Sequence, residues 1–225
     1  MAYFNRNFVS FFKDLSINNN RDWFNENKSR FKEDVEEPFY HFVDELITRI
    51  RDDDPQIQIT PKEAVFRIYR DVRFSKDKSP YKIHVSAVIS PGGRKDFVMA
   101  GHYLEMNHKG LGLYGGLYSV GPTELNNLRH YIANNLTEFK KLRRDKKFQE
   151  KFGEVLGEAN KRIPKEFDEI FQKEPLIANK QFYFYHKFPQ KLILSGDLSD
   201  TIIEYYKVSK PLTKFLREGV LFENY

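Results

Sequence analysis

A strongly charged part of the sequence, residues 66–82, also contains aromatic and β-branched side chains. It holds three arginines at intervals of three residues, together with two aspartates: Arg67, Arg70, Arg73, Asp71 and Asp77. Guanidinium groups that lie close together can bind a phosphate or a carboxylate through pairs of parallel N–H donors. The pattern therefore indicates a site for a small anionic ligand, if the fold brings the arginines together.

A straight strand would keep these arginines apart. The aromatic and β-branched residues after Pro61 predict a strand from residue 64 to about Arg70. Arg67 and Arg73 would then share one face at a separation of roughly 20 Å. A bend near Asp71 could bring them together, and at about 6–7 Å each pair of guanidinium groups would repel by roughly 2–3 kcal/mol at an effective dielectric constant near 20. An anionic ligand would offset that repulsion.

The predicted ligand-binding set extends beyond the arginines. Lysines would add point charge, an aspartate would orient an arginine, and a tyrosine would offer a hydroxyl group or a stacking face. The full set comprises Arg67, Arg70, Asp71, Arg73, Asp77, Lys78, Tyr81 and Lys82. Candidates for proton transfer beside a bound ligand are His84, Asp71 and Tyr81. The sequence leaves open whether any reaction follows binding.

Two other interpretations of the same residues stay open. Arginines and aspartates at close spacing can form a structural salt-bridge network, in which case the protein would be an interaction module. Alternatively, the protein could bind nucleic acid through both of its basic stretches, residues 66–82 and 140–151. The second stretch, KKLRRDKKFQEK, is also typical of the solvated face of one continuous helix.

Composition narrows the possible functions. Of the formal net charge of +5, residues 66–82 contribute +4 and residues 140–151 contribute +5, so the remainder of the 225 residues sums to −4. The absence of cysteine excludes disulfides, thiolate metal sites and a cysteine nucleophile. Metal-ligand spacings, phosphate loops and dinucleotide fingerprints are also absent, so we expect no metal and no cofactor. Without a signal-peptide pattern or a long apolar run, we expect a soluble cytoplasmic protein with no membrane partner.

The elements that must position these residues are predicted from the spacing of apolar side chains. Helical spacing predicts helices within residues 1–54 and 122–172, and a C-terminal helix over 198–218 that is interrupted at Pro211. Between the first two helical regions, residues 57–118 contain the alternating run 82–89, followed by apolar runs that short turns separate. These features predict an antiparallel meander over about 64–118.

The meander should contain three neighbouring antiparallel strands, over residues 82–89, 97–106 and 111–118. Gly115 and Gly116 in the last strand predict a bulge or a close backbone approach. A further hairpin is predicted near 182–195, around Pro189. Together these elements predict a single α+β domain over residues 1–225, in which N-terminal and C-terminal helices pack against an antiparallel sheet.

The arginine motif also resembles a known signature. The pattern R-x-x-R-D-x-R-F-x-x-D-K-x-x-Y, from Arg67 to Tyr81, is similar to that of a widespread bacterial family of conserved hypothetical proteins, a domain of unknown function. The segments NNNRDWFNENKSRF and GHYLEM are similar as well, so the resemblance covers nearly the whole chain. It supports the motif residues as a site, but it implies no particular chemistry.

Overall fold

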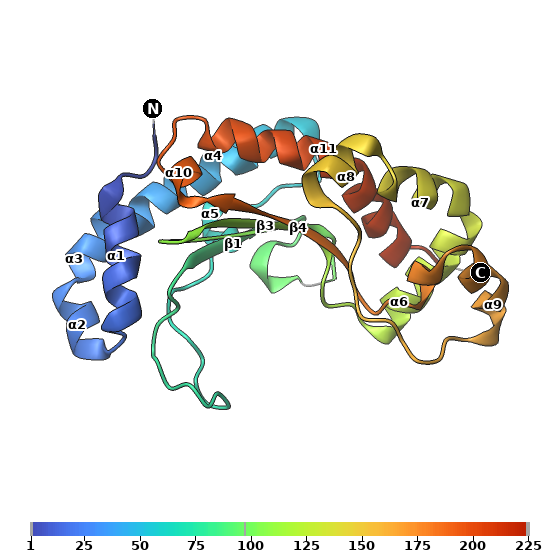
Figure 1. Cartoon of the computed structure of the whole chain (residues 1–225), viewed down its shortest axis with the longest axis horizontal. Coiled ribbons are helices and arrows are strands. Elements are labelled where there is room, and N and C mark those ends of the chain that lie inside the picture. Colours follow the sequence, from blue (N-terminus) through green and yellow to red (C-terminus); the bar gives the residue numbers. More distant parts are fainter. Residues whose placement is uncertain (1, 97, 224–225) are drawn as a thin grey trace. The chain divides into compact units, whose positions relative to one another are not determined.

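The structure is a computed structural model that describes residues 2–96 and 98–223 (Figure 1). It contains helices and one four-stranded antiparallel sheet, so the predicted α+β class is confirmed. Contacts divide the chain into a first compact unit, formed by Met1–Ile89, Tyr103–Leu113 and Lys187–Ile203, and a second compact unit, formed by Ser90–His102, Tyr114–His186 and Glu204–Tyr225. Each unit is therefore built from segments that are far apart in the sequence.

The N-terminal region is helical, as predicted. Its helices are α1 (Arg6–Ile17), α2 (Arg21–Glu26), α3 (Lys28–Phe31) and α4 (Glu37–Asp53), with a π-helical turn at Lys32–Glu36. In α1 the apolar residues at helical spacing are all buried: Phe8, Phe11, Phe12 and Leu15. Asn20 caps α2 by accepting a hydrogen bond from the backbone N–H of Trp23. These helices form much of the phenylalanine-rich core of the first unit.

The sheet has the strand order β1-β2-β3-β4. Its strands are β1 (Val85–Ile89), β2 (Gly101–Asn107), β3 (Gly110–Leu117) and β4 (Phe182–Pro189). The first three confirm the predicted antiparallel neighbours, although Phe97, where the second predicted strand begins, lies outside the described residues. Gly116 has a positive φ of 101°, and a Cβ there would collide with the carbonyl oxygen of Phe182. The close backbone approach predicted at this position is therefore confirmed.

Two strand predictions are wrong. Residues 64–70 are not a strand of the sheet: α5 (Pro61–Ala64) precedes them, and only isolated bridges pair them with the returning chain. The second half of the predicted hairpin at 182–195 is the short helix α10 (Gln190–Ile193). A short apolar run has no period long enough to separate strand from helix, and Pro189 can precede a helix as easily as a turn.

The second helical region differs from the prediction at its basic stretch. Its helices are α6 (Pro122–Asn134), α7 (Leu136–Arg143), α8 (Lys146–Phe152) and α9 (Asp168–Lys173), with 3₁₀ turns at Lys165–Phe167 and Pro175–Ala178 and an earlier one at Gly93–Lys95. The continuous helix expected over 140–151 is wrong. It breaks at Arg144 and Asp145, because the Asp145 side chain accepts a hydrogen bond from the backbone N–H of Phe148 and so starts a new helix.

The C-terminal helix is longer than predicted. α11 (Leu198–Val220) continues through Pro211, so the predicted interruption is wrong. Buried neighbours on both sides of the proline, including Ser209, Leu212 and Phe215, hold the helix in place. Among the described residues, no helix combines the length and the apolar character that crossing a bilayer requires.

Candidate functional site

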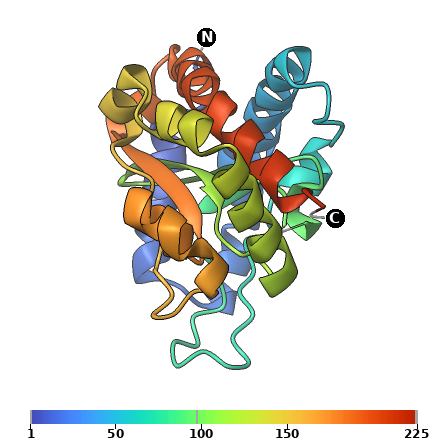
Figure 2. The same ribbon diagram turned by 90° about the vertical axis from the view of Figure 1, so that its right-hand side faces the viewer.

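The arginine motif lies on a two-stranded arm, residues 65–84, that connects α5 to β1 in the first unit. In Figure 1 and in the perpendicular view of Figure 2, this teal segment extends away from β1 as a long loop. Antiparallel bridges join Val65 to Ala87 and Tyr69 to Tyr81. The bridged residues are four apart in the first strand and six apart in the second. The returning strand therefore has two extra residues, which is why β1 begins at Val85 and not at Lys82 as predicted.

Tyr81 anchors the arm to the N-terminal helices. Its ring stacks on Phe24 with the ring centroids 3.9 Å apart, and it also contacts Tyr69 at 5.4 Å. The Asn19 side chain donates a hydrogen bond to the Tyr81 carbonyl oxygen and accepts one from its N–H, at 2.9 and 3.1 Å. Tyr81 is consequently buried, and burial raises the pKa of its hydroxyl. Its ring is packed inside the protein and is not exposed to a ligand in solvent.

Two of the three arginines pair with the two aspartates in the distal part of the arm. Arg70 forms an ion pair with Asp77, and it also donates to the carbonyl oxygen of Ser79 at 3.2 Å. Arg73 donates through Nε and Nη2 to the Asp71 carboxylate, at 3.0 and 2.7 Å. Arg67 acts on Asp71 through its charge only, so the three arginines do not share one hydrogen-bonded partner. Each of these pairs joins residues close in sequence and shapes the loop between the two strands.

The pairing also changes the acidity of both aspartates. Hydrogen bonds from the side chain and backbone of Arg73 lower the pKa of Asp71 to about 2. The hydroxyl and N–H of Ser79, followed by Arg70, lower the pKa of Asp77 to about 2. Both carboxylates are therefore ionised at neutral pH, and neither can act as a general acid there.

Arg67 and Lys82 differ from the distal arginines. Neither forms an ion pair with a carboxylate of the described residues. The Lys82 ammonium lies 5.1 Å from the centre of the Phe66 ring, and Phe66 packs edge-on against Tyr103 of β2. Burial and then the charge of Arg67 lower the pKa of Lys82. The base of the arm therefore holds two nearby positive charges beside the rings of Phe66 and Tyr103.

His84 lies next to these charges. Burial lowers the pKa of His84, the Glu105 carboxylate raises it in part, and Lys82 lowers it further. Glu105 also accepts a hydrogen bond from the Tyr103 hydroxyl, at 3.4 Å. A neutral imidazole beside a carboxylate is an arrangement that can accept and return a proton. We call the six residues at the base of the arm the arm-base cluster: Phe66, Arg67, Lys82, His84, Tyr103 and Glu105.

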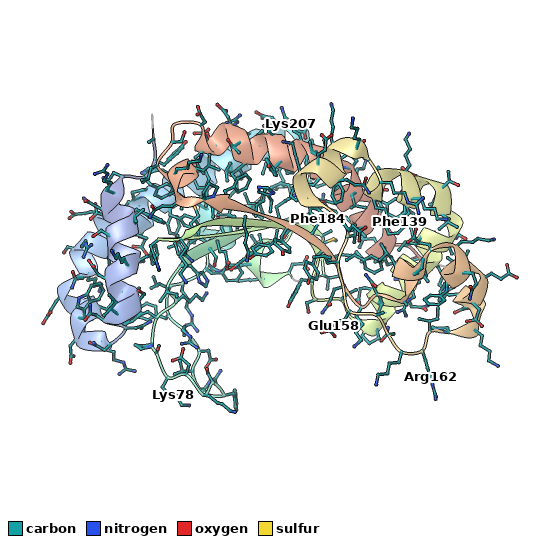
Figure 3. All side chains as sticks on the ribbon, in the orientation of Figure 1. Lys78, Phe139, Glu158, Arg162, Phe184 and Lys207 are labelled. Atoms are coloured by element: carbon teal, nitrogen blue, oxygen red, sulfur yellow. The ribbon has the colours of Figure 1, made fainter. Side chains whose placement is uncertain are left out.

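The predicted site residues thus separate into three places. Arg67, Lys82 and His84 lie at the base, Tyr81 is buried beneath it, and the remaining residues lie toward the distal end: Arg70, Asp71, Arg73, Asp77 and Lys78. Lys78, labelled in Figure 3, donates to the carbonyl oxygen of Val72 at 2.9 Å. Sequence reasoning did not include Phe66, Tyr103 or Glu105 in the site. Tyr103 and Glu105 lie on β2 and Phe66 lies on the arm, and no local pattern indicates that these two segments meet.

Most of the basic residues of 140–151, in the second unit, lie on the surface, but two have packing roles. Arg143 donates through Nε and Nη2 to Glu174, at 3.0 and 2.7 Å. Lys151 pairs with Glu204 at 2.8 Å and lies 4.1 Å from the centre of the Tyr205 ring. The two basic stretches belong to different units, and the interpretation that both contact nucleic acid stays a hypothesis.

Other features offer less chemistry. A hollow of about 340 Å³ is lined by Glu36, Glu37, Tyr40 and His41, and its two carboxylates do not suit an anionic ligand. No group of three or more histidine, aspartate or glutamate side chains within the described ranges is placed to hold a metal ion.

Comparison with known proteins agrees with the family resemblance. The model of a conserved hypothetical protein family, DUF2461, matches residues 7–215. The chain belongs to this family. Neither curated proteins nor solved structures gave a match. The DUF2461 match covers the arm, both basic stretches and all four strands, and the family description names no ligand or reaction.

Proposed function

We propose that this DUF2461 protein binds a small phosphate- or carboxylate-bearing ligand at the arm-base cluster. The observation that carries the proposal is that only some of the cations in residues 66–82 form ion pairs with carboxylates. The distal arginines form ion pairs with aspartates, whereas Arg67 and Lys82 lie near each other and neither forms an ion pair among the described residues. Arg67 attracts the Asp71 carboxylate through its charge only. An anion between two such cations would replace their repulsion with attraction.

The surroundings of the two cations support selective binding. Arg67 supplies a planar fork that suits two oxygens of a phosphate or carboxylate, and Lys82 supplies a compact charge. The Phe66 and Tyr103 rings limit solvent on one side, which strengthens the electrostatic attraction. The proposed site is therefore smaller than the sequence motif, because it leaves Arg70, Arg73 and their aspartates as the support of the arm.

His84 determines what the site could do beyond binding. Its lowered pKa keeps the imidazole neutral near pH 7, so it can accept a proton from a bound ligand. A ligand that carries an acidic proton near its anionic group would use both the two cations and the neutral imidazole. Binding is the proposed function, and proton transfer at His84 is the reaction type that this site would support.

Thermal unfolding in a series of phosphate, sulfate and dicarboxylate concentrations tests the proposal. An anion that binds only the folded state raises the melting temperature with concentration. Arg67→Gln and Lys82→Gln should each abolish that rise, while leaving the melting temperature without anion unchanged or slightly higher because a repulsion is removed. Lys62→Gln, an exposed lysine of α5 in the same unit, is the matched control and should respond like the parent protein.

Two results would contradict the proposal. One is a parent protein whose melting temperature does not respond to any of these anions. The other is an equal response in Arg67→Gln, Lys82→Gln and the Lys62→Gln control, which would assign the effect to general salt stabilisation.

A further inference from the structure

The distal end of the arm, residues 71–79, presents a phenylalanine to solvent. Phe74 is 97% exposed, which is the highest value among the large apolar side chains of the described residues. A side chain in that position contributes almost nothing to the stability of its own fold. A single exposed apolar side chain is common on protein surfaces. A ring on a projecting loop that also carries exposed cations is nevertheless available for contact with another molecule.

The loop around Phe74 is held in shape. Arg70 donates to the Ser79 carbonyl oxygen and forms the ion pair with Asp77. The Asp77 carboxylate in turn accepts from the N–H and the hydroxyl of Ser79, at 2.9 and 2.6 Å. On the other side, the Lys78 ammonium donates to the Val72 carbonyl oxygen at 2.9 Å. A loop that is already ordered loses less entropy when it binds.

The charge around Phe74 is positive. The Arg73 guanidinium lies 5.9 Å from the centre of the Phe74 ring, and Lys76 and Lys78 are exposed on the same loop. Neither lysine forms an ion pair with a carboxylate of the described residues. Lys78 uses one of its three N–H donors on Val72 and keeps two for a ligand. The loop therefore combines an aromatic face with several cations.

We infer that the distal end of the arm binds single-stranded nucleic acid, with a base stacked on Phe74 and phosphates at Lys76 and Lys78. Base stacking on an aromatic ring beside cations that contact the backbone is how single strands are bound without sequence preference. A single ring can stack only on a base that is not already stacked, which favours a single strand over a duplex. Asp71 and Asp77 disfavour insertion into an anionic membrane, because they would enter the interface with the ring.

This site is distinct from the arm-base cluster, and the two proposals can fail separately. Fluorescence anisotropy of labelled oligothymidine and oligouridine, titrated with the full chain, measures binding at the distal end of the arm. Affinity should fall with salt, with a log–log slope of about −0.7 for each phosphate contacted. Lys76→Gln and Lys78→Gln should each reduce that slope by about 0.7.

Phe74 variants give the sharpest readout. Phe74→Ala should weaken binding by about 5- to 150-fold, the range expected for loss of one base–aromatic stack, and Phe74→Trp should restore it. Ile17→Ala is the matched control, because Ile17 is also an exposed apolar residue of the first unit, at 77%, and should bind like the parent protein. The melting temperatures of all variants should agree, because neither side chain is buried.

Several results would overturn the inference. They are absence of binding at low salt, equal affinity of Phe74→Ala and the parent protein, or tighter binding to a duplex of the same sequence. Binding to phosphatidylserine vesicles but not to single strands would instead assign the loop to a membrane surface. Arg67→Gln should affect the anion response described above while leaving the effect of Phe74→Ala on oligonucleotide binding intact.

Discussion

The distal end of the arm, residues 71–79, and the basic segment 140–151 each contain one phenylalanine among several cations. Phe74 is 97% exposed in the arm, whereas Phe148 is 1% exposed in α8 and packs against Phe152 and Phe184. Similar local compositions thus have opposite roles. One aromatic side chain stabilises the core of its unit, and the other is displayed to solvent.

The cations of the two regions differ in the same way. Arg143 and Lys151 reach acidic residues 31 and 53 positions away, so they join distant segments of the second unit. Arg70 and Arg73 pair with aspartates only seven and two positions away. The Arg143–Glu174 pair is in a buried setting and stabilises tertiary structure, whereas the short-range exposed pairs shape a loop. Arg143 and Lys151 therefore connect distant segments, whereas the cations of the arm remain in a local loop.

The largest expected effect concerns the two phenylalanines. Phe148→Ala should lower the free energy of unfolding by about 3–5 kcal/mol, because it leaves a cavity against Phe184. Phe74→Ala should change it by no more than about 0.5 kcal/mol. Urea denaturation of both variants measures the two values. Similar losses in the two variants would show that Phe74 packs against its own fold in solution.

The next effect tests the buried ion pair of the basic segment. Arg143→Gln should cost about 3–5 kcal/mol, because it leaves the Glu174 carboxylate, which is 0% exposed, without its cation. The neighbouring variant Arg144→Gln is the control, and it should stay within about 0.5 kcal/mol because Arg144 is exposed. Equal costs would mean that net charge, and not the pair with Glu174, determines the stability.

A smaller effect is expected inside the arm. Arg70→Gln removes hydrogen bonds to Ser79 and Ser75 and should cost about 1 kcal/mol. Hydrogen exchange should show the loss locally, as faster exchange of the Arg70 N–H, which donates to the Pro80 carbonyl oxygen. Lys76→Gln, on the same loop, should leave that exchange rate unchanged. An unchanged rate in Arg70→Gln would show that the bridges alone hold the arm.

The smallest effect is a pH dependence confined to the distal loop. The pKa values of Asp71 and Asp77 are about 2, below their ordinary value of 3.8. The hydrogen bonds that these carboxylates accept, from Arg73 for Asp71 and from Ser79 and then Arg70 for Asp77, therefore stabilise the loop fully above pH 3.8. This stabilisation is lost as the pH falls from there through about 2. Carboxyl chemical shifts followed by NMR should report both midpoints. Midpoints near 3.8 would indicate that these hydrogen bonds are not maintained in solution.

Much of the fold follows from local patterns in the sequence. Helical spacing in Phe8, Phe11, Phe12 and Leu15 identified α1, because a helix buries one face whatever it packs against. Alternation and short turns identified β1, β2 and β3, and the paired glycines at 115–116 indicated a close approach. The errors at 64–70 and 190–193 fall on short segments, where the local preference is weak and neighbouring segments decide the conformation.

The candidate site follows from the sequence only in part. The charged segment 66–82 identified Arg67 and Lys82, His84 was a separate candidate for proton transfer, and the residue types by themselves determined that the region is cationic and aromatic. Only the tertiary structure decided that Arg70 and Arg73 pair with aspartates, that Tyr81 is buried against Phe24, and that Phe74 is not buried at all. The physical reason is that exposure and ion pairing depend on which distant segments approach a residue. The long-range contacts that bury Tyr81 and Phe148 leave no periodic signal in the chain, whereas the helix and strand patterns do.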